Sequence, residues 1–144
     1  MRGYFGQPLA TAATLTIDGW VRTGDIGYFD DHGHLYITDR LKELVKVKGY
    51  QVAPAELEAL LLTHPDVADA AVIGRPDDRA GEVPVAYVVA RGTLDAPALK
   101  AWVAERVADY KRIAEVLACD AIPKSPTGKI LRRVLRAQDQ AARG

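Results

Sequence analysis

Two apolar runs, residues 67–73 and 83–89, constrain the fold of this chain most. Both have the residue types of strands, and the second is apolar almost throughout. A strand without a polar face belongs in the interior of a sheet. The Gly, Pro and Asp residues at 74–81 predict a loop between the two strands. The core of the chain is therefore expected to form around a sheet.

A helix is predicted before these strands. Pro54 occupies the first-turn position that proline favours, and Glu56 and Glu58 lie near the positive end of the helix dipole. His64 and the proline after it end the helix. The apolar stripe that would face the core consists of Leu57, Leu60 and Leu61.

Further elements follow the second strand. Asp95 is expected to cap a helix whose core-facing positions recur at helical spacing, at Leu99, Trp102, Val103, Arg106 and Val107. A short strand at 115–119 precedes a last helix with an apolar side formed by Ile130, Leu131, Val134 and Leu135. We interpret the basic side of that helix as solvated, at Arg132, Arg133 and Arg136. This order predicts the α+β class, with helices packed on a small mixed sheet.

The amino-terminal part is expected to contain a β-hairpin, because segments 27–29 and 35–38 flank a glycine-ended turn. His32 and His34 are interpreted as solvated turn residues, and no metal site is expected. Residues 42–52 predict a second strand pair broken at Gly49, with Leu41, Val45 and Val47 on one face. Residues 1–20 show no periodicity and by themselves predict a poorly ordered tail.

Size, charge and cysteine content exclude several classes of protein. A chain of 144 residues holds one domain of about 100 residues and an appendage. Nineteen basic and nineteen acidic residues balance, so no overall field attracts nucleic acid or an anionic membrane. Cys119 is the single cysteine, which fits a reducing cytoplasm. No apolar run has the length of a membrane span.

The motif richest in chemical information is Thr127-Gly128-Lys129, after Pro123 and before a basic segment. A phosphate loop of the Walker type would need glycine at Pro123 and Ser or Thr at Ile130, so that motif is excluded. A lysine on a glycine turn can present one cation to a developing negative charge. The alternative is an exposed lysine after a turn. Upstream, Asp25 could accept hydrogen bonds from a sugar diol or only stabilise its turn.

Three segments in this order, residues 20–25, 39–52 and 123–133, resemble the carboxyl-terminal part of the adenylate-forming acyl-CoA ligases, the AMP-binding superfamily that includes 4-coumarate:CoA ligase. The resemblance implies that residues 1–40 are a remnant of a large amino-terminal AMP-binding domain leading to a hinge. Residues 41–144 would then be the mobile carboxyl-terminal lid.

The resemblance also implies roles for single residues in the nucleotide chemistry. Lys129 matches the catalytic lysine that contacts the carboxylate and the α-phosphate. Asp25 and Arg40 match the residues that bind the ribose, and Gln51 matches a nucleotide contact.

A second group of residues is matched to the movement of the lid. Lys42 matches the hinge, and Lys46 and Gly49 match residues of the thioester step, where a missing Cβ permits close approach. The alternatives are an edge-strand lysine that blocks aggregation and a plain hairpin glycine.

The implied activity is that of an ATP-dependent acyl-CoA ligase, in which a carboxylate and ATP form an acyl-adenylate and CoA then forms the thioester. ATP, CoA and Mg²⁺ would belong to the parent enzyme, and this chain alone is expected to be inactive without the amino-terminal domain. One alternative is a free-standing noncatalytic module that pairs with a separate large domain. Another is the lid of a peptide-synthetase adenylation domain.

Overall fold

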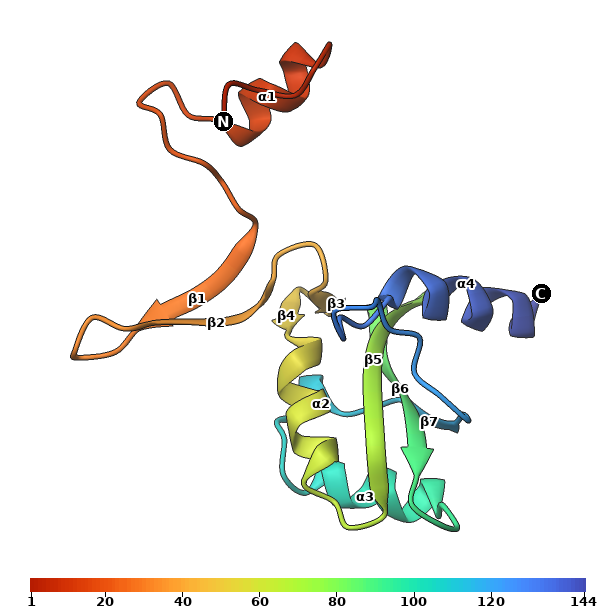
Figure 1. The fold of residues 1–144 in the computed structure, drawn as a ribbon. Coiled ribbons are helices and arrows are strands. Elements are labelled where there is room, and N and C mark those ends of the chain that lie inside the picture. The colour runs from red at the N-terminus through yellow and green to blue at the C-terminus, as the bar shows by residue number, and fades with distance from the viewer.

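The computed structural model describes residues 1–144 and confirms the α+β class. A short helix and four consecutive strands come first and are followed by helices interspersed with strands, and Figure 1 shows that the first part stands away from the rest. The elements are α1 Pro8–Thr14, β1 Asp25–Phe29, β2 Leu35–Arg40, β3 Val45–Val47, β4 Tyr50–Val52, α2 Pro54–Leu62, β5 Val67–Asp77, β6 Gly81–Ala90, α3 Ala96–Ala104, the 3-10 turn η1 Asp109–Lys111, β7 Glu115–Ala118 and α4 Arg132–Arg143.

The larger sheet is built around β6, as its apolar sequence predicts. Strand β5 pairs antiparallel with β6 along its length, and β7 pairs parallel with the other edge of β6. The β3–β4 hairpin joins that same edge through Val47 and Gly81. The predicted loop at 74–81 is wrong in extent, because β5 continues to Asp77 and β6 starts at Gly81. The Asp77 carboxylate closes the turn by accepting the N–H groups of Arg79 and Ala80 at 2.9 and 2.8 Å.

Helices cover both faces of this sheet. Alternate residues of β5 and β6 point to opposite sides, as the period of a strand requires. One set packs with helices α2 and α3, through Val72, Val88, Leu57, Leu61 and Leu99. The other set packs under α4, through Ala71, Ile73, Val85, Ile122 and Leu135. Strand β6 therefore needs apolar residues on both faces.

The helix bounds agree with the sequence for α2 and for the start of α3, and differ at the end of α3 and the start of α4. Helix α2 begins at Pro54, and Asp95 caps α3 by accepting the Ala98 N–H at 2.9 Å. Helix α3 ends at Ala104, so the predicted stripe positions at Arg106 and Val107 lie beyond it. Helix α4 begins at Arg132, and its predicted apolar positions Ile130 and Leu131 precede it, in the loop.

The first 44 residues contain no buried residue. The β1–β2 hairpin confirms the prediction and forms a separate two-stranded sheet. The prediction of a tail without structure is wrong at Pro8–Thr14, where proline in the first turn and three alanines favour the short helix α1. Helix α1 buries none of its residues. None of the helices combines the length and apolar character needed to cross a membrane.

Candidate functional site

Asp25 and Arg40 meet at the open end of the first hairpin. They are register partners on β1 and β2, and the Arg40 Nε lies 2.8 Å from the Asp25 Oδ1. The side chain of Asp25 is 24% exposed and that of Arg40 54% exposed. The pair thus offers a carboxylate acceptor and a guanidinium donor side by side, which suits a ligand with hydroxyl groups.

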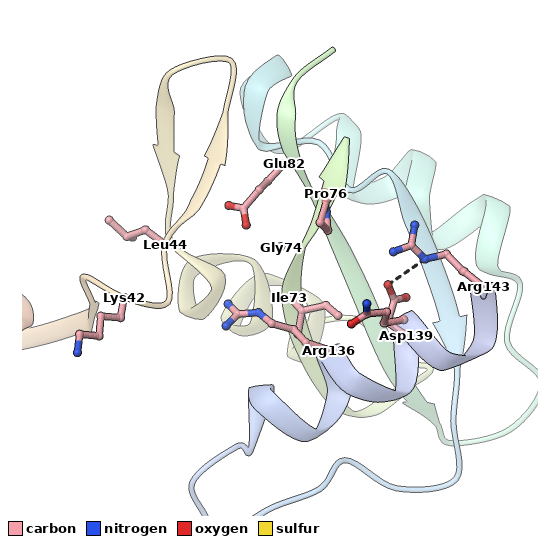
Figure 2. Close-up of a pocket in the computed structure, with 10 residues that line it drawn as sticks. Lys42, Leu44, Ile73, Gly74, Pro76, Glu82, Arg136, Asp139 and Arg143 are labelled. Atoms are coloured by element: carbon pink, nitrogen blue, oxygen red, sulfur yellow. Dashed lines mark ion pairs between the residues drawn. The ribbon is translucent and has the colours of Figure 1, made fainter. Parts of the chain in front are cut away.

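A tight turn connects this pair to the rest of the chain. The Glu43 N–H donates to the Arg40 carbonyl at 2.9 Å, and Lys42 is exposed within the turn. Lys42 also lines a groove of about 390 Å³ between the turn, the sheet and α4 (Figure 2). Across this groove, the Arg136 Nη2 lies 3.5 Å from the Glu43 carboxylate.

One hydrogen bond crosses the turn directly. The Asp39 carboxylate, at the end of β2, accepts the N–H of Ala55 at 3.2 Å. Ala55 lies in the first turn of α2, and the N-cap residue Ala53 supplies no side-chain acceptor. Asp39 therefore satisfies one of the free N–H groups at the start of a helix that belongs to the other part of the molecule.

The β3–β4 hairpin places Lys46, Gln51 and Gly49 together. Lys46 and Gln51 are direct cross-strand partners with exposed side chains. Lys48 and Gly49 have φ of +49° and +86°, the conformation of a two-residue type I′ turn. A Cβ added at Gly49 would meet no atom within 4 Å, so the space beside the turn is open. The predicted partner of Val45 and Val47, Leu41, is 58% exposed and does not share their buried face.

Lys129 lies on a closed loop between β7 and α4. The ends of the loop are joined by a bond from the Leu131 N–H to the Pro123 carbonyl at 2.8 Å. Ser125 closes the inner turn, because its N–H donates to the Lys129 carbonyl at 2.8 Å and its Oγ accepts the Lys129 N–H at 3.1 Å. Gly128 has φ +81°. Lys129 is exposed, and its ammonium takes part in none of the ion pairs of the structure.

The predicted site residues thus form separate groups in this structure. Asp25 pairs with Arg40 and Lys46 with Gln51, whereas the Lys129 loop has no hydrogen bond to either group. The loop is tied to the first half of β5 through Lys124 and Asp69. The hairpin of Gly49 instead touches the β5–β6 turn, where the Lys48 N–H donates to the Ala80 carbonyl at 2.8 Å.

Sequence reasoning missed a buried ion pair next to the Lys129 loop. Arg132 was interpreted as solvated, but its Nη2 lies 2.8 and 2.7 Å from the two carboxylate oxygens of Glu58. Burial raises the pKa of Glu58, and the bonds from Val72 and Arg132 partly offset this. A signal was present in the sequence, since Pro54, Glu58 and Leu61 share the side of α2 that faces the core.

A second missed network holds the end of α4. Buried Asp139 accepts bonds from Arg75 and, at 2.9 Å, from the Tyr87 hydroxyl. The Arg75 bond is the main reason that the pKa of Asp139 is lowered, whereas burial is the main reason that the pKa of Tyr87 is raised to about 12. Arg136, also interpreted as solvated, pairs with Glu43, and only Arg133 of the three arginines makes no ion pair.

Comparison with known proteins identifies the class. Residues 56–129 match the family model of the AMP-binding enzyme C-terminal domain, and the chain belongs to this family. It is 57% identical over 140 residues to 4-coumarate--CoA ligase 2 of Nicotiana tabacum, covering 96% of this chain and 26% of that protein. The chain therefore spans about a quarter of the length of this relative. The resemblance to adenylate-forming acyl-CoA ligases is confirmed.

Solved structures of one relative differ in their likeness to this chain. ATP-bound MatB from Rhodopseudomonas palustris superposes with a TM-score of 0.89 at 32% identity, covering 95% of this chain and 28% of MatB. Apo MatB superposes with a TM-score of 0.69 at 33% identity, covering 94% of this chain and 28% of MatB. The arrangement described here is closer to that of the ATP-bound protein.

Proposed function

We propose that this chain is the mobile carboxyl-terminal lid of an ATP-dependent acyl-CoA ligase and carries the catalytic lysine, Lys129. The observation that carries the proposal is the exposed, unpaired Lys129 on a closed loop at the end of the matched family domain. In the first half-reaction, a carboxylate oxygen attacks the α-phosphorus of ATP and pyrophosphate leaves. Lys129 donates to the oxygens on which negative charge accumulates, and so lowers the barrier.

The Asp25–Arg40 pair is proposed to bind the ribose of the nucleotide. A carboxylate accepts both hydroxyl hydrogens of a diol, and the 2.8 Å contact with Arg40 orients it. Gln51 is proposed as a further nucleotide contact from the exposed face of β4.

In the second half-reaction, the sulfur of CoA attacks the acyl carbon and AMP leaves. Lys46 and Gly49 are proposed to serve this step, because the open space at the type I′ turn admits a thin chain such as pantetheine. Lys129 and Gly49 lie on separate loops, so a rotation near Lys42 is proposed to present them in turn. The higher TM-score to ATP-bound MatB supports assigning this arrangement to the first half-reaction.

Different parts of the chain are proposed to belong to different domains of the parent enzyme. Residues 1–40 are proposed to belong with the amino-terminal domain of the parent, and residues 41–144 to form the lid. ATP and CoA are substrates of that parent, which we propose to be cytoplasmic. Mg²⁺ would accompany ATP, but no group of three His, Cys, Asp or Glu side chains here could hold it, so we assign it no ligand in this chain. Alone, the chain is expected to lack ATP–pyrophosphate exchange.

A chimera tests the proposal. The segment of the tobacco 4-coumarate--CoA ligase that matches this chain is replaced by residues 1–144. We expect the chimera to form an adenylate from 4-coumarate and ATP, and Lys129→Ala to slow this step about 10²- to 10³-fold. Transfer of the acyl group from a preformed adenylate to CoA, with release of AMP, should be largely retained. Lys42→Pro should show the reverse pattern, because proline restricts φ at the pivot.

Two controls make the result decisive. Arg133→Ala removes a nearby cation that makes no ion pair, and should leave both half-reactions unchanged. If Lys129→Ala leaves the rate of adenylate formation by a folded chimera unchanged, the proposed function is wrong. Mixing the amino-terminal part of the tobacco enzyme with the separate 144-residue chain tests the alternative of an independent module, which predicts full activity without a covalent link.

A further inference from the structure

The Lys129 loop makes its hydrogen bonds almost entirely within itself. Ser125 contacts both backbone groups of Lys129, and the remaining bonds of the loop join Ser125 to Thr127 and Gly128 and Pro123 to Leu131. Such bonds fix the shape of the loop but not its direction relative to the sheet. The direction must come from the residues that attach each end of the loop to the core.

Ile122 and Ile130 pack on the smaller core cluster, and the loop has in addition two polar attachments, which differ in burial. At the first end, Lys124 pairs with Asp69, and their side chains are 36% and 30% exposed. Ion pairs that solvent reaches constrain geometry weakly. At the second end, three residues after Lys129, Arg132 pairs with Glu58, and their side chains are only 11% and 9% exposed. The buried attachment is thus the one close to the lysine.

Arg132 is held by three bonds from two elements. Its Nη2 donates to both oxygens of Glu58 on α2, and its Nε donates to the Val72 carbonyl on β5 at 3.2 Å. Glu58 in turn accepts the Val72 N–H at 2.8 Å, so the carboxylate is fixed before it receives the arginine. The planar fork of a guanidinium fits this arrangement, whereas an ammonium is a point charge and cannot reproduce it.

This contact lies at the start of α4. Arg132 is the first helical residue, and the N-cap residue Leu131 provides no side-chain acceptor. A guanidinium only donates and so does not cap the free N–H groups there, but its three bonds hold the side chain of this first helical residue against α2 and β5. The end of the Lys129 loop that leads into α4 is therefore held at a position fixed by Glu58 and Val72.

We propose that Arg132 and Glu58 are positioning residues for Lys129, which aim the lysine loop at the α-phosphate through a buried fork between α4, α2 and β5. The inference rests on the proposed function for the role of Lys129, but the fixed direction of the loop can be measured without it. Neither residue touches the reacting atoms. Arg132→Lys keeps the charge and removes the fork, and so separates geometry from electrostatics.

The first experiment uses the 144-residue chain alone. Backbone ¹⁵N relaxation compares the wild type with Arg132→Lys, with Arg133→Lys as the matched control on the exposed neighbour. We expect the order parameters of residues 127–130 to fall from about 0.85 towards 0.6 in Arg132→Lys only. Asp139→Asn controls for loss of a buried ion pair elsewhere on α4, and should leave these residues rigid. A loop that stays equally rigid in Arg132→Lys overturns the proposal.

The second experiment measures the two half-reactions of the chimera separately. We expect Arg132→Lys to slow adenylate formation at saturating ATP about 10- to 100-fold, the scale for a misplaced catalytic group, and to spare thioester formation from preformed adenylate. Glu58→Gln keeps the shape and an acceptor for Val72, and should give a smaller loss of the same kind. It replaces Arg132→Lys if that variant does not fold.

The outcomes separate the two hypotheses. Equal loss in both half-reactions means that the pair only stabilises the fold, and no loss means that it does not aim Lys129, so either result overturns the positioning role. If Lys129→Ala itself spares adenylation, the proposed function fails, while the relaxation experiment still decides whether Arg132 orders the loop.

Discussion

The first 44 residues and the remainder of the chain use apolar side chains in opposite ways. Every buried residue lies between Val45 and Asp139. In the amino-terminal part, by contrast, large apolar side chains are exposed, among them Phe5, Leu9, Ile17, Trp20 and Phe29. Both regions contain large apolar residues. What separates them is whether a sheet with helices on both faces is present to cover the apolar surface.

The difference has a physical origin and a functional meaning. A two-stranded hairpin such as β1–β2 has marginal stability by itself and cannot form a core. Exposed apolar surface of this extent marks a region that another surface covers. The chain spans 26% of the tobacco relative, and we propose that the amino-terminal domain of such a parent covers residues 1–40.

The largest expected contrast is in hydrogen exchange. Amides of α1 should exchange at close to their intrinsic rates, because a helix of seven residues with no buried residue is not stable in isolation. Amides of β6, and those amides of β5 that bond to β6, should open only with global unfolding, at a free energy of roughly 5 to 15 kcal/mol. Exchange measured residue by residue by NMR tests this. Comparable protection in α1 would show that the first part is ordered by the second.

Substitution of one buried and one exposed leucine tests the difference in stability between the two regions. Leu61 is fully buried and Leu9 is 87% exposed. Leu61→Ala should lower the free energy of unfolding by about 2 to 5 kcal/mol, through lost transfer energy and a cavity. Leu9→Ala should change it by less than about 0.5 kcal/mol. Urea denaturation followed by circular dichroism measures both, and similar losses would contradict the division described here.

Asp139 and Asp30 offer the same comparison in pH dependence. The pKa of Asp139 is lowered mainly by Arg75, and that of Asp30 mainly by the His34 backbone N–H. Because the folded pKa of Asp139 lies below the unfolded value of about 3.9, its stabilisation is present above that pH and is lost as the pH falls through the folded pKa.

Asp139→Asn should therefore cost about 1 to 3 kcal/mol at neutral pH and flatten the loss of stability in acid. The matched change Asp30→Asn, in the exposed hairpin, should leave the global free energy of unfolding and its pH dependence unchanged. Unfolding curves collected from neutral to acidic pH measure how each substitution changes the free energy of unfolding. A pH profile altered equally by both changes would argue for a single cooperative unit.

The smallest expected effect compares two glycine turns. Gly49 and Gly33 have φ of +86° and +81°, and a Cβ at either would meet no atom within 4 Å. Alanine should impose similar local strain at both, of about 1 kcal/mol. Only Gly49→Ala should lower the free energy of global unfolding, since only its hairpin belongs to the larger sheet. Equal losses from both alanines in denaturant titrations would show that the two regions unfold as one unit.

The sequence predicted the elements better than the contacts between them. Apolar periodicity located β5, β6 and α2 because local patterns determine those elements. Asp25 was singled out as a carboxylate after a turn, whereas Arg40 was proposed only through the family resemblance, and the hairpin register brings the two residues together. The Glu58–Arg132 pair was missed because the two residues are 74 positions apart, and only the tertiary fold turns an apparently solvated arginine into a buried one.

The Asp39 carboxylate has a consequence for the balance between orientations of the lid. It supplies an acceptor to α2 from outside the segment that we propose to rotate, so rotation about Lys42 would leave the Ala55 N–H to water. A capping bond of this kind contributes about 1 kcal/mol, which corresponds to roughly a fivefold ratio of populations. This bond by itself would thus favour the arrangement described here by a small margin. A ligand that favours the other orientation would need only a slight preference to reverse it.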